Sequence, residues 1–143
     1  MPLTESEIQL FNDTLDLCVA DPQFLERFYR TFVGHSPEIA RLFAQTDMRR
    51  QHRALKASLY TTMLAADQNA AAISHLQALG ERHRELGVAD RDYDTWLECI
   101  LAAVEATVEG YDEEIESVWR RVLAVGIAVL RDGRMPDSDL RIV

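Results

Sequence analysis

Apolar residues recur every three to four positions along most of the chain, which is the period of an amphipathic α-helix. The first such stripe joins Ile8, Phe11 and Leu15. Thr4 and Glu7 precede it at the spacing of a capping box, in which each side chain satisfies a backbone N–H at the start of a helix. Because the same period returns wherever apolar residues cluster, the pattern predicts an all-α fold.

Cap residues, prolines and glycines divide this pattern into seven predicted helices. Pro22 and Pro37 each follow a residue that commonly caps a helix, and proline suits the first helical position. The predicted helices run from Thr4 to about Val19, from Asp21 to Gly34, from Ser36 to Phe43, from Asp47 to about Ala65, from about Ile73 to Gly87, from Asp90 to Gly110 and from Asp112 to Gly133. The chain beyond about residue 134 is expected to be loose.

The chain has 143 residues, 48% of them hydrophobic, and no repeat or linker divides it, so we expect one domain over residues 1–143. Its 24 acidic residues outnumber 15 Lys and Arg, which gives a formal net charge of -9. A charge of this sign repels phosphate, so nucleic acid and anionic membranes are not expected as main partners unless the basic residues cluster. The sequence shows no strong basic cluster, and its densest basic group is Arg49, Arg50 and Arg53.

The two cysteines, Cys18 and Cys99, are far apart and form no Cys-x-x-Cys motif, which argues against a zinc knuckle or a disulfide framework. No segment has the roughly 18 consecutive apolar residues of a membrane span, and the N-terminus has no signal-peptide pattern. We therefore expect a soluble protein of the cytoplasm.

Candidate chemistry centres on one histidine. His83 shares a predicted helical face with Leu76 and Leu79, so its ring is expected to point inward. The four histidines show no metal-ligand spacing such as H-x-x-x-H, and the chain has no phosphate loop, nucleophile elbow or Cys-x-x-Cys-His haem attachment. On these grounds alone His83 is either a core histidine bonded to a backbone carbonyl or a ligand.

Three segments of the chain contain residues at spacings that are typical of a known protein family. Pro37 is followed six residues later by Phe43, and Gln51 is followed one turn later by Leu55. The third segment runs from Leu79 through His83 to Gly87 and Val88, with the aromatic residues Tyr93 and Trp119 further along the chain. These residues resemble the globin family along nearly the whole chain, and the segment around His83 resembles the part that provides the iron ligand.

The resemblance implies a globin fold, a three-over-three helical sandwich around a haem pocket. It implies a non-covalent haem b with His83 as the proximal iron ligand, and a helical carbonyl near Leu79 is expected to hold the other ring N–H. The residues expected to contact haem are Phe43, Val88, Tyr93 and Trp96. Arg50 and Arg82 are weaker candidates for pairing with the haem propionates.

On the ligand side, the resemblance is to single-domain bacterial globins and to the haem domain of flavohaemoglobins. Tyr29, Gln51 and Leu55 match the residues that face the ligand there. A phenol O–H and an amide N–H would each stabilise bound oxygen by roughly 0.5–1.5 kcal/mol, so slow release is expected. His52 competes with Gln51 for this place, but that register would put the charged Lys56 in the pocket, so His52 is predicted at the surface.

The remaining histidines, His35 and His75, are predicted to be exposed near helix ends. One departure concerns the glutamate that strengthens the proximal histidine in flavohaemoglobins, because Arg131, Asp132 and Arg134 occupy its expected neighbourhood. The length also leaves no room for a flavin domain, so turnover is expected to need an external reductase, whose basic surface the net negative charge would attract.

Three functions follow as hypotheses. The first is reversible binding of dioxygen or a related diatomic ligand, for transport, storage or scavenging. The second is enzymatic, a nitric oxide dioxygenase that detoxifies nitric oxide with electrons from a separate reductase. The third is a non-haem helical interaction module with a structural His83. A monomer and a homodimer are both compatible with the sequence.

Overall fold

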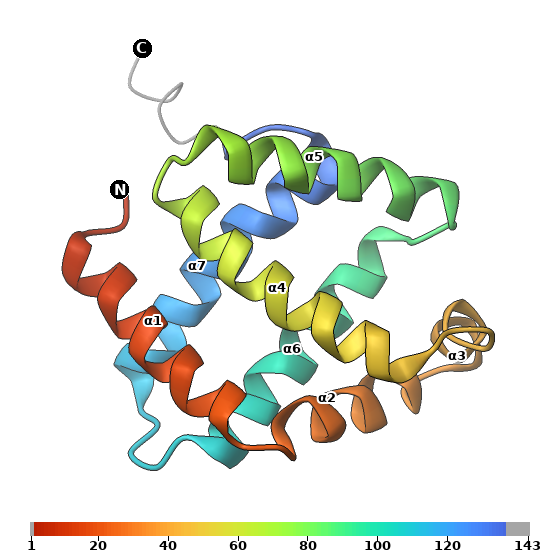
Figure 1. The fold of residues 1–143 in the computed structure, drawn as a ribbon, viewed down its shortest axis with the longest axis horizontal. Coiled ribbons are helices and arrows are strands. Elements are labelled where there is room, and N and C mark those ends of the chain that lie inside the picture. The colour runs from red at the N-terminus through yellow and green to blue at the C-terminus, as the bar shows by residue number, and fades with distance from the viewer. Residues whose placement is uncertain (1, 137–143) are drawn as a thin grey trace.

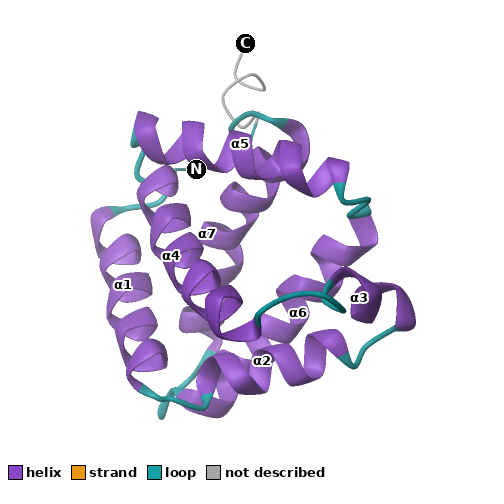
Figure 2. Cartoon of the chain, turned by 45° about the vertical axis from the view of Figure 1, so that its right-hand side comes forward, coloured by secondary structure: helices purple, strands orange, loops and turns teal. Residues whose placement is uncertain are grey.

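The computed structural model describes residues 2–136, which form seven helices joined by short loops and contain no strand (Figures 1 and 2). The all-α prediction is therefore confirmed. The helices are α1 (Glu5–Ala20), α2 (Phe24–Val33), α3 (Pro37–Leu42), α4 (Met48–Ala66), α5 (Ala70–Glu85), α6 (Asp90–Thr107) and α7 (Glu113–Asp132).

The six longer helices form two layers of three. Helices α1, α4 and α5 lie in front of α6 and α7 in Figure 1, and α2 packs against α6 in the second layer. Helix α7 contacts all three members of the first layer, so it forms the centre of the fold. This is the three-over-three arrangement that the family resemblance implies, with the short α3 packed against α2.

Most predicted helix starts have the expected caps. The Thr4 and Glu7 side chains form the capping box at α1, and Ser36 and Asp47 accept backbone N–H groups at the starts of α3 and α4. Asp112 does the same for α7, which ends at Gly133 in the left-handed conformation that glycine adopts without a Cβ penalty. Local chemistry therefore sets these ends.

Two predicted starts are wrong, one by two residues and the other by one residue. Asp21 does not cap α2, because its carboxylate accepts the N–H of Gln23 in a tight turn that delays the helix to Phe24. Helix α6 begins at Asp90 itself, while Asp92 reaches back to the N–H of Ala89. In both cases a short acidic side chain bonds to nearby backbone in a way that the helical period does not specify.

The connection between α4 and α5 is also shorter than predicted. It comprises residues 67–69 instead of 65–72, since Asn69 caps α5 directly. Residues 134–136 follow α7 without helix, and the rest of the predicted loose tail, residues 137–143, lies outside the described residues. None of the described helices is long and apolar enough to cross a membrane.

A buried pair ties the two layers together. The rings of Phe11 on α1 and Trp119 on α7 lie 4.4 Å apart between centroids, and both side chains are fully buried. The indole N–H of Trp119 donates to the Thr14 hydroxyl at 2.7 Å, which satisfies the one polar atom of the indole inside the core. The position of α7 against α1 is thereby fixed.

The other end of α7 approaches α5 and α4 closely. At Gly80 on α5, an added Cβ would lie 2.2 Å from the carbonyl oxygen of Leu130 on α7. At Gly126 on α7, it would lie 2.6 Å from a methyl carbon of Thr62 on α4. At Gly80 the opposing atoms belong to the α7 backbone, whereas at Gly126 they belong to the Thr62 side chain, so a larger residue at either position requires a shift of its neighbour. Both crossings border the cavity described next.

Candidate functional site

A cavity of about 350 Å³ lies among helices α2 to α7. Its inner wall is apolar and includes Leu76, Leu123 and Leu130. Its size falls in the range of roughly 300–1,000 Å³ that is usual for ligand and cofactor pockets. The eight residues that were predicted to contact haem or its ligand all line it: Tyr29, Phe43, Gln51, Leu55, His83, Val88, Tyr93 and Trp96. Arg50, a weaker candidate for pairing with the haem propionates, does not line it.

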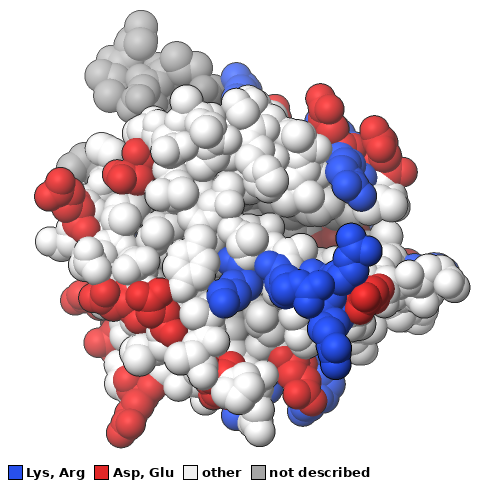
Figure 3. All heavy atoms as spheres, in the orientation of Figure 1, with Lys and Arg blue, Asp and Glu red and all other residues white. Residues whose placement is uncertain are grey.

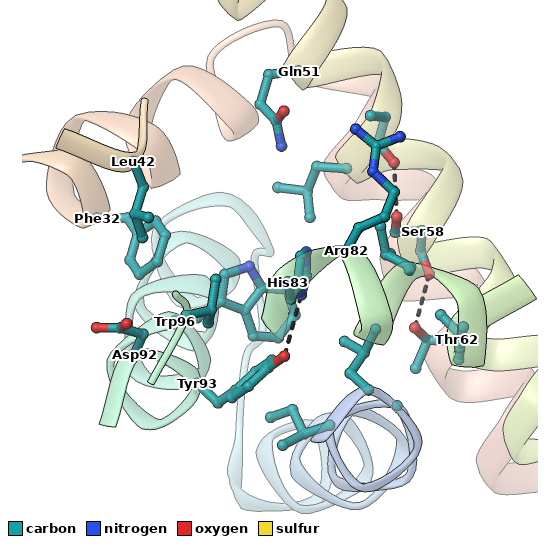
Figure 4. Close-up of a pocket in the computed structure, with 18 of the residues that line it drawn as sticks. Phe32, Leu42, Gln51, Ser58, Thr62, Arg82, His83, Asp92, Tyr93 and Trp96 are labelled. Atoms are coloured by element: carbon teal, nitrogen blue, oxygen red, sulfur yellow. Dashed lines mark hydrogen bonds between the residues drawn. The ribbon is translucent and has the colours of Figure 1, made fainter. Parts of the chain in front are cut away.

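His83 extends from α5 into the cavity, toward the side where α6 presents Tyr93 (Figure 4). Its Nδ1 atom lies 3.2 Å from the Tyr93 hydroxyl. The predicted partner, a carbonyl near Leu79, is therefore wrong, because a neighbouring helix provides the contact. With a proton on Nδ1, the ring donates to the tyrosine oxygen and keeps the lone pair of Nε2 for a ligand.

Burial, and secondarily the nearby Arg82 guanidinium, lower the pKa of His83 from its usual value of 6.5. Both effects disfavour the charged ring, so His83 is neutral at pH 7, which is the form that binds metals. Burial also raises the pKa of Tyr93, whose hydroxyl therefore keeps its proton at neutral pH. The two groups form a neutral, oriented pair.

Tyr29 from α2 and Gln51 from α4 meet on another wall of the cavity, and Gln51 points into it (Figure 4). The amide of Gln51 donates to the Tyr29 hydroxyl at 3.0 Å. The hydroxyl in turn donates to the backbone carbonyl of Gln51 at 3.4 Å, which is long for an O–H···O bond. Burial raises the pKa of Tyr29, so this side chain remains a hydrogen-bond donor at physiological pH.

His52 does not line the cavity, in agreement with its predicted exclusion from the pocket. The surface position predicted for it is wrong, however, since its ring is partly buried and lies parallel to that of Tyr29, with centroids 5.1 Å apart and 7° between the planes. Gln51 therefore points from α4 into the cavity, while the ring of the next residue, His52, stacks on the ring of Tyr29. His35 and His75 are exposed, as predicted.

Several cavity residues were not predicted as site residues. Ser58 and Thr62 on α4 follow Leu55 by three and seven positions, so the helical period that predicted Leu55 also indicates them. Arg82, predicted only as a weak candidate, borders the cavity. Leu86 also lines it while 62% exposed, just after the end of α5. Leu86 follows His83 by three positions, so the helical period that predicted an inward His83 also indicates this leucine.

Comparison with known proteins places these features in a family. A sequence model of the globin family matches residues 26–130, which include both walls described above. The chain belongs to the globin family. This globin resembles a Pseudomonas aeruginosa PAO1 protein whose crystal structure is reported as structurally highly homologous to a human haemoglobin. The two chains are 34% identical, with a TM-score of 0.83 over 88% of this chain and 96% of the other.

Curated relatives of this globin are named flavohaemoproteins. Those of Bacillus thuringiensis subsp. konkukian and Bacillus anthracis are each 27% identical over 126 residues, which cover 86% of this chain. The same residues cover 31% of each relative, so the globin spans less than a third of the length of the curated proteins that it matches. The likeness therefore concerns the globin part alone.

Proposed function

We propose that this globin binds haem b and reversibly holds dioxygen or a related diatomic ligand. One observation carries the proposal: an apolar cavity presents His83 from one wall and the paired Tyr29 and Gln51 from another. A single neutral imidazole is the usual proximal ligand of globin haem, and two polar donors suit the opposite side.

The residues present fit haem. It is a large, mostly apolar plate, and Phe43, Val88 and Trp96 give the cavity the apolar surface that such a plate needs. His83 would hold the iron through Nε2 while Tyr93 fixes the ring, and the exposed Arg82 can pair with the haem carboxylates. When bound, haem supplies an iron centre with a position open to a diatomic ligand.

Tyr29 and Gln51 act in sequence on the distal side. The long bond from the Tyr29 hydroxyl to the Gln51 carbonyl is weak, so the hydroxyl can turn toward a ligand at small cost. The Gln51 amide keeps donating to the tyrosine oxygen, which polarises the O–H and strengthens its donation. A ligand that carries partial negative charge is held longer as a result.

The absorbance spectrum of the purified protein with haem supplied tests the proximal assignment. We expect a Soret band and a ferrous spectrum that His83→Ala alters. His75→Ala is the matched control, because His75 is exposed on the same helix. A protein without a Soret band, or an unchanged ferrous spectrum in His83→Ala, would overturn the proposal; the first result would favour the non-haem interaction module.

Release kinetics test the distal assignment. Tyr29→Phe is expected to speed oxygen release about tenfold, the factor that corresponds to about 1.4 kcal/mol. Tyr60→Phe is the control, since the Tyr60 hydroxyl bonds to Asp16 away from the cavity. Equal release rates for the wild type and Tyr29→Phe would show that this hydroxyl does not reach the ligand.

A second candidate function is nitric oxide dioxygenation with an external reductase. The likeness to flavohaemoproteins and the contact of Tyr93 with His83 favour it. The carboxylate of Asp132, however, pairs with its neighbour Arg131, so the acidic partner of the proximal histidine is not provided there. Catalytic consumption of nitric oxide with a cellular reductant would support the enzyme, whereas stoichiometric consumption would leave only the ligand carrier.

The cytoplasm remains the proposed location. Cys18 and Cys99 are both free and buried, which agrees with a reducing compartment. Cell fractionation is the direct test, and recovery of the protein outside the cytoplasm would contradict the proposal.

A further inference from the structure

Four cations stand together on a chain that is otherwise strongly acidic. They are Arg49, Arg50, Arg53 and Lys56, here called the α4 cationic row. All four are exposed, and α4 contains no Asp or Glu. The rest of the chain has 11 Lys and Arg against 24 Asp and Glu. Figure 3 shows blue side chains gathered over the N-terminal half of α4, while red ones dominate the left of the same face.

The placement of the row lowers the stability of the helix. Arg49 and Arg50 lie in the first turn of α4, where the partial positive charge of the helix end disfavours cations. Arg53 follows them by four and three positions, a spacing at which like charges repel. Helices α1, α2, α3, α6 and α7 have acidic residues in their first turn, whereas α4 and α5 have none, and the first turn of α4 contains two arginines.

The row also has no internal partner. Among the ion pairs of residues 2–136, none involves Arg49, Arg50, Arg53 or Lys56. Asp47, the nearest acidic residue before the helix, uses its carboxylate to cap the N–H of Arg49. A group of charges that opposes local stability and remains unpaired is typical of a functional surface.

The α4 cationic row lies on the face of α4 opposite to the face that lines the cavity. Arg49, Arg53 and Lys56 share the outer face of α4, while Gln51, Leu55 and Ser58 share the inner face and line the cavity. One helix diameter, about 10–12 Å, separates the two faces. A protein docked on the row therefore comes close to the cavity.

We propose that the α4 cationic row is the docking surface for an acidic electron-transfer protein, a one-electron donor that keeps the site reduced. This inference rests on the proposed haem function, because haem iron that has lost an electron must regain one before it again binds oxygen. The partner's acidic surface meets the row directly, and steering by the row raises the association rate. The proposed partner is acidic, whereas the net charge of the chain led us to expect a basic reductase surface. The charge of the residues at the contact, and not the net charge of the chain, determines which partner surface is attracted.

The experiment measures binding of an acidic flavodoxin to the haem-free and haem-loaded chain by calorimetry at 20 and 200 mM salt, with a basic cytochrome c as the contrasting probe. The test variant carries Arg49→Gln, Arg50→Gln and Arg53→Gln. The control variant carries Arg30→Gln, Arg91→Gln and Arg131→Gln, which remove three exposed cations elsewhere. Both variants lose the same charge.

Flavodoxin is expected to bind the wild type and the control, and to bind the test variant roughly tenfold more weakly, with the difference shrinking at high salt. The test variant is also expected to unfold at no lower temperature than the wild type, since the row opposes the helix dipole. Loss of helix stability in the test variant would assign the row a structural role instead.

Three results would overturn the proposal: equal flavodoxin affinity in the test variant and wild type, equal weakening in both variants, or no flavodoxin binding by a chain that binds haem. Dissociation of a wild-type dimer by the test variant would assign the row to a second copy of this chain. Because the haem-free chain is also measured, a failure of haem binding is distinguishable from a failure of docking.

Discussion

The contact between Gly80 and Leu130 allows a quantitative prediction for Gly80→Ala. The added Cβ would lie 2.2 Å from the Leu130 carbonyl oxygen, whereas ordinary contact begins at 3.4 Å, so α5 and α7 must separate by about 1 Å. Overpacking of this kind costs about 1–3 kcal/mol, and the upper end applies because the opposing atoms are backbone. Alanine returns about 1 kcal/mol through its higher helix propensity. The net loss is therefore about 2 kcal/mol.

Urea unfolding of the haem-free protein measures this loss in the free energy of unfolding. In thermal unfolding the same loss corresponds to a fall in Tm of roughly 4–8 °C. Ser74→Ala is the control, because Ser74 is an exposed residue of the same helix and gains propensity without a contact. Since Gly80 lies one turn before His83, Gly80→Ala should also weaken haem binding. A Gly80→Ala protein as stable as Ser74→Ala would refute the close-approach argument.

Three further predictions concern the two walls of the cavity. Tyr93→Phe should lower haem affinity about 10–100-fold and shift the iron–histidine stretching frequency, because Nδ1 of His83 loses its partner; an unshifted frequency would contradict this. His52→Ala should speed oxygen release a few-fold by removing the ring stacked on Tyr29, and His52→Phe should restore the wild-type rate. Burial lowers the folded-state pKa of His83 below 6.5, so the unfolded chain binds more protons in acid than the folded chain does. The stability of the haem-free protein should therefore fall as the pH drops below about 6.5. The fall should be smaller in His83→Gln.

The fold was predictable because local signals coincide with the helical period. Ser36 with Pro37, and Asp112 with Gly133, each combine a cap or stop with an apolar stripe, and the structure follows them. Asp21 misled because its carboxylate forms a turn bond at Gln23 before the helix begins. An aspartate can accept a backbone N–H either in a turn or at the start of a helix, and the sequence alone does not distinguish the two.

The site was only partly predictable. The family resemblance placed His83, Tyr29 and Gln51, and all three line one cavity in the structure. Their partners depend on which helices become neighbours: α6 brings Tyr93 to His83, and the approach of α2 to α4 lays His52 on Tyr29. The sequence shows Arg49, Arg50 and Arg53 close together, but only the structure shows that no ion pair among the described residues involves them.

The cavity also makes the stability of the fold depend on the concentration of the cofactor that fills it. It interrupts the core with about 350 Å³ that side chains leave unfilled, so a ligand that occupies it only in the folded state adds directly to the free energy of unfolding. At a ligand concentration a thousand times the Kd this addition is about 4.1 kcal/mol, a large part of the 5–15 kcal/mol that usually holds a domain together. Chains made without the ligand would unfold more often and be degraded sooner, so the cellular amount of this protein would follow the cofactor available to it.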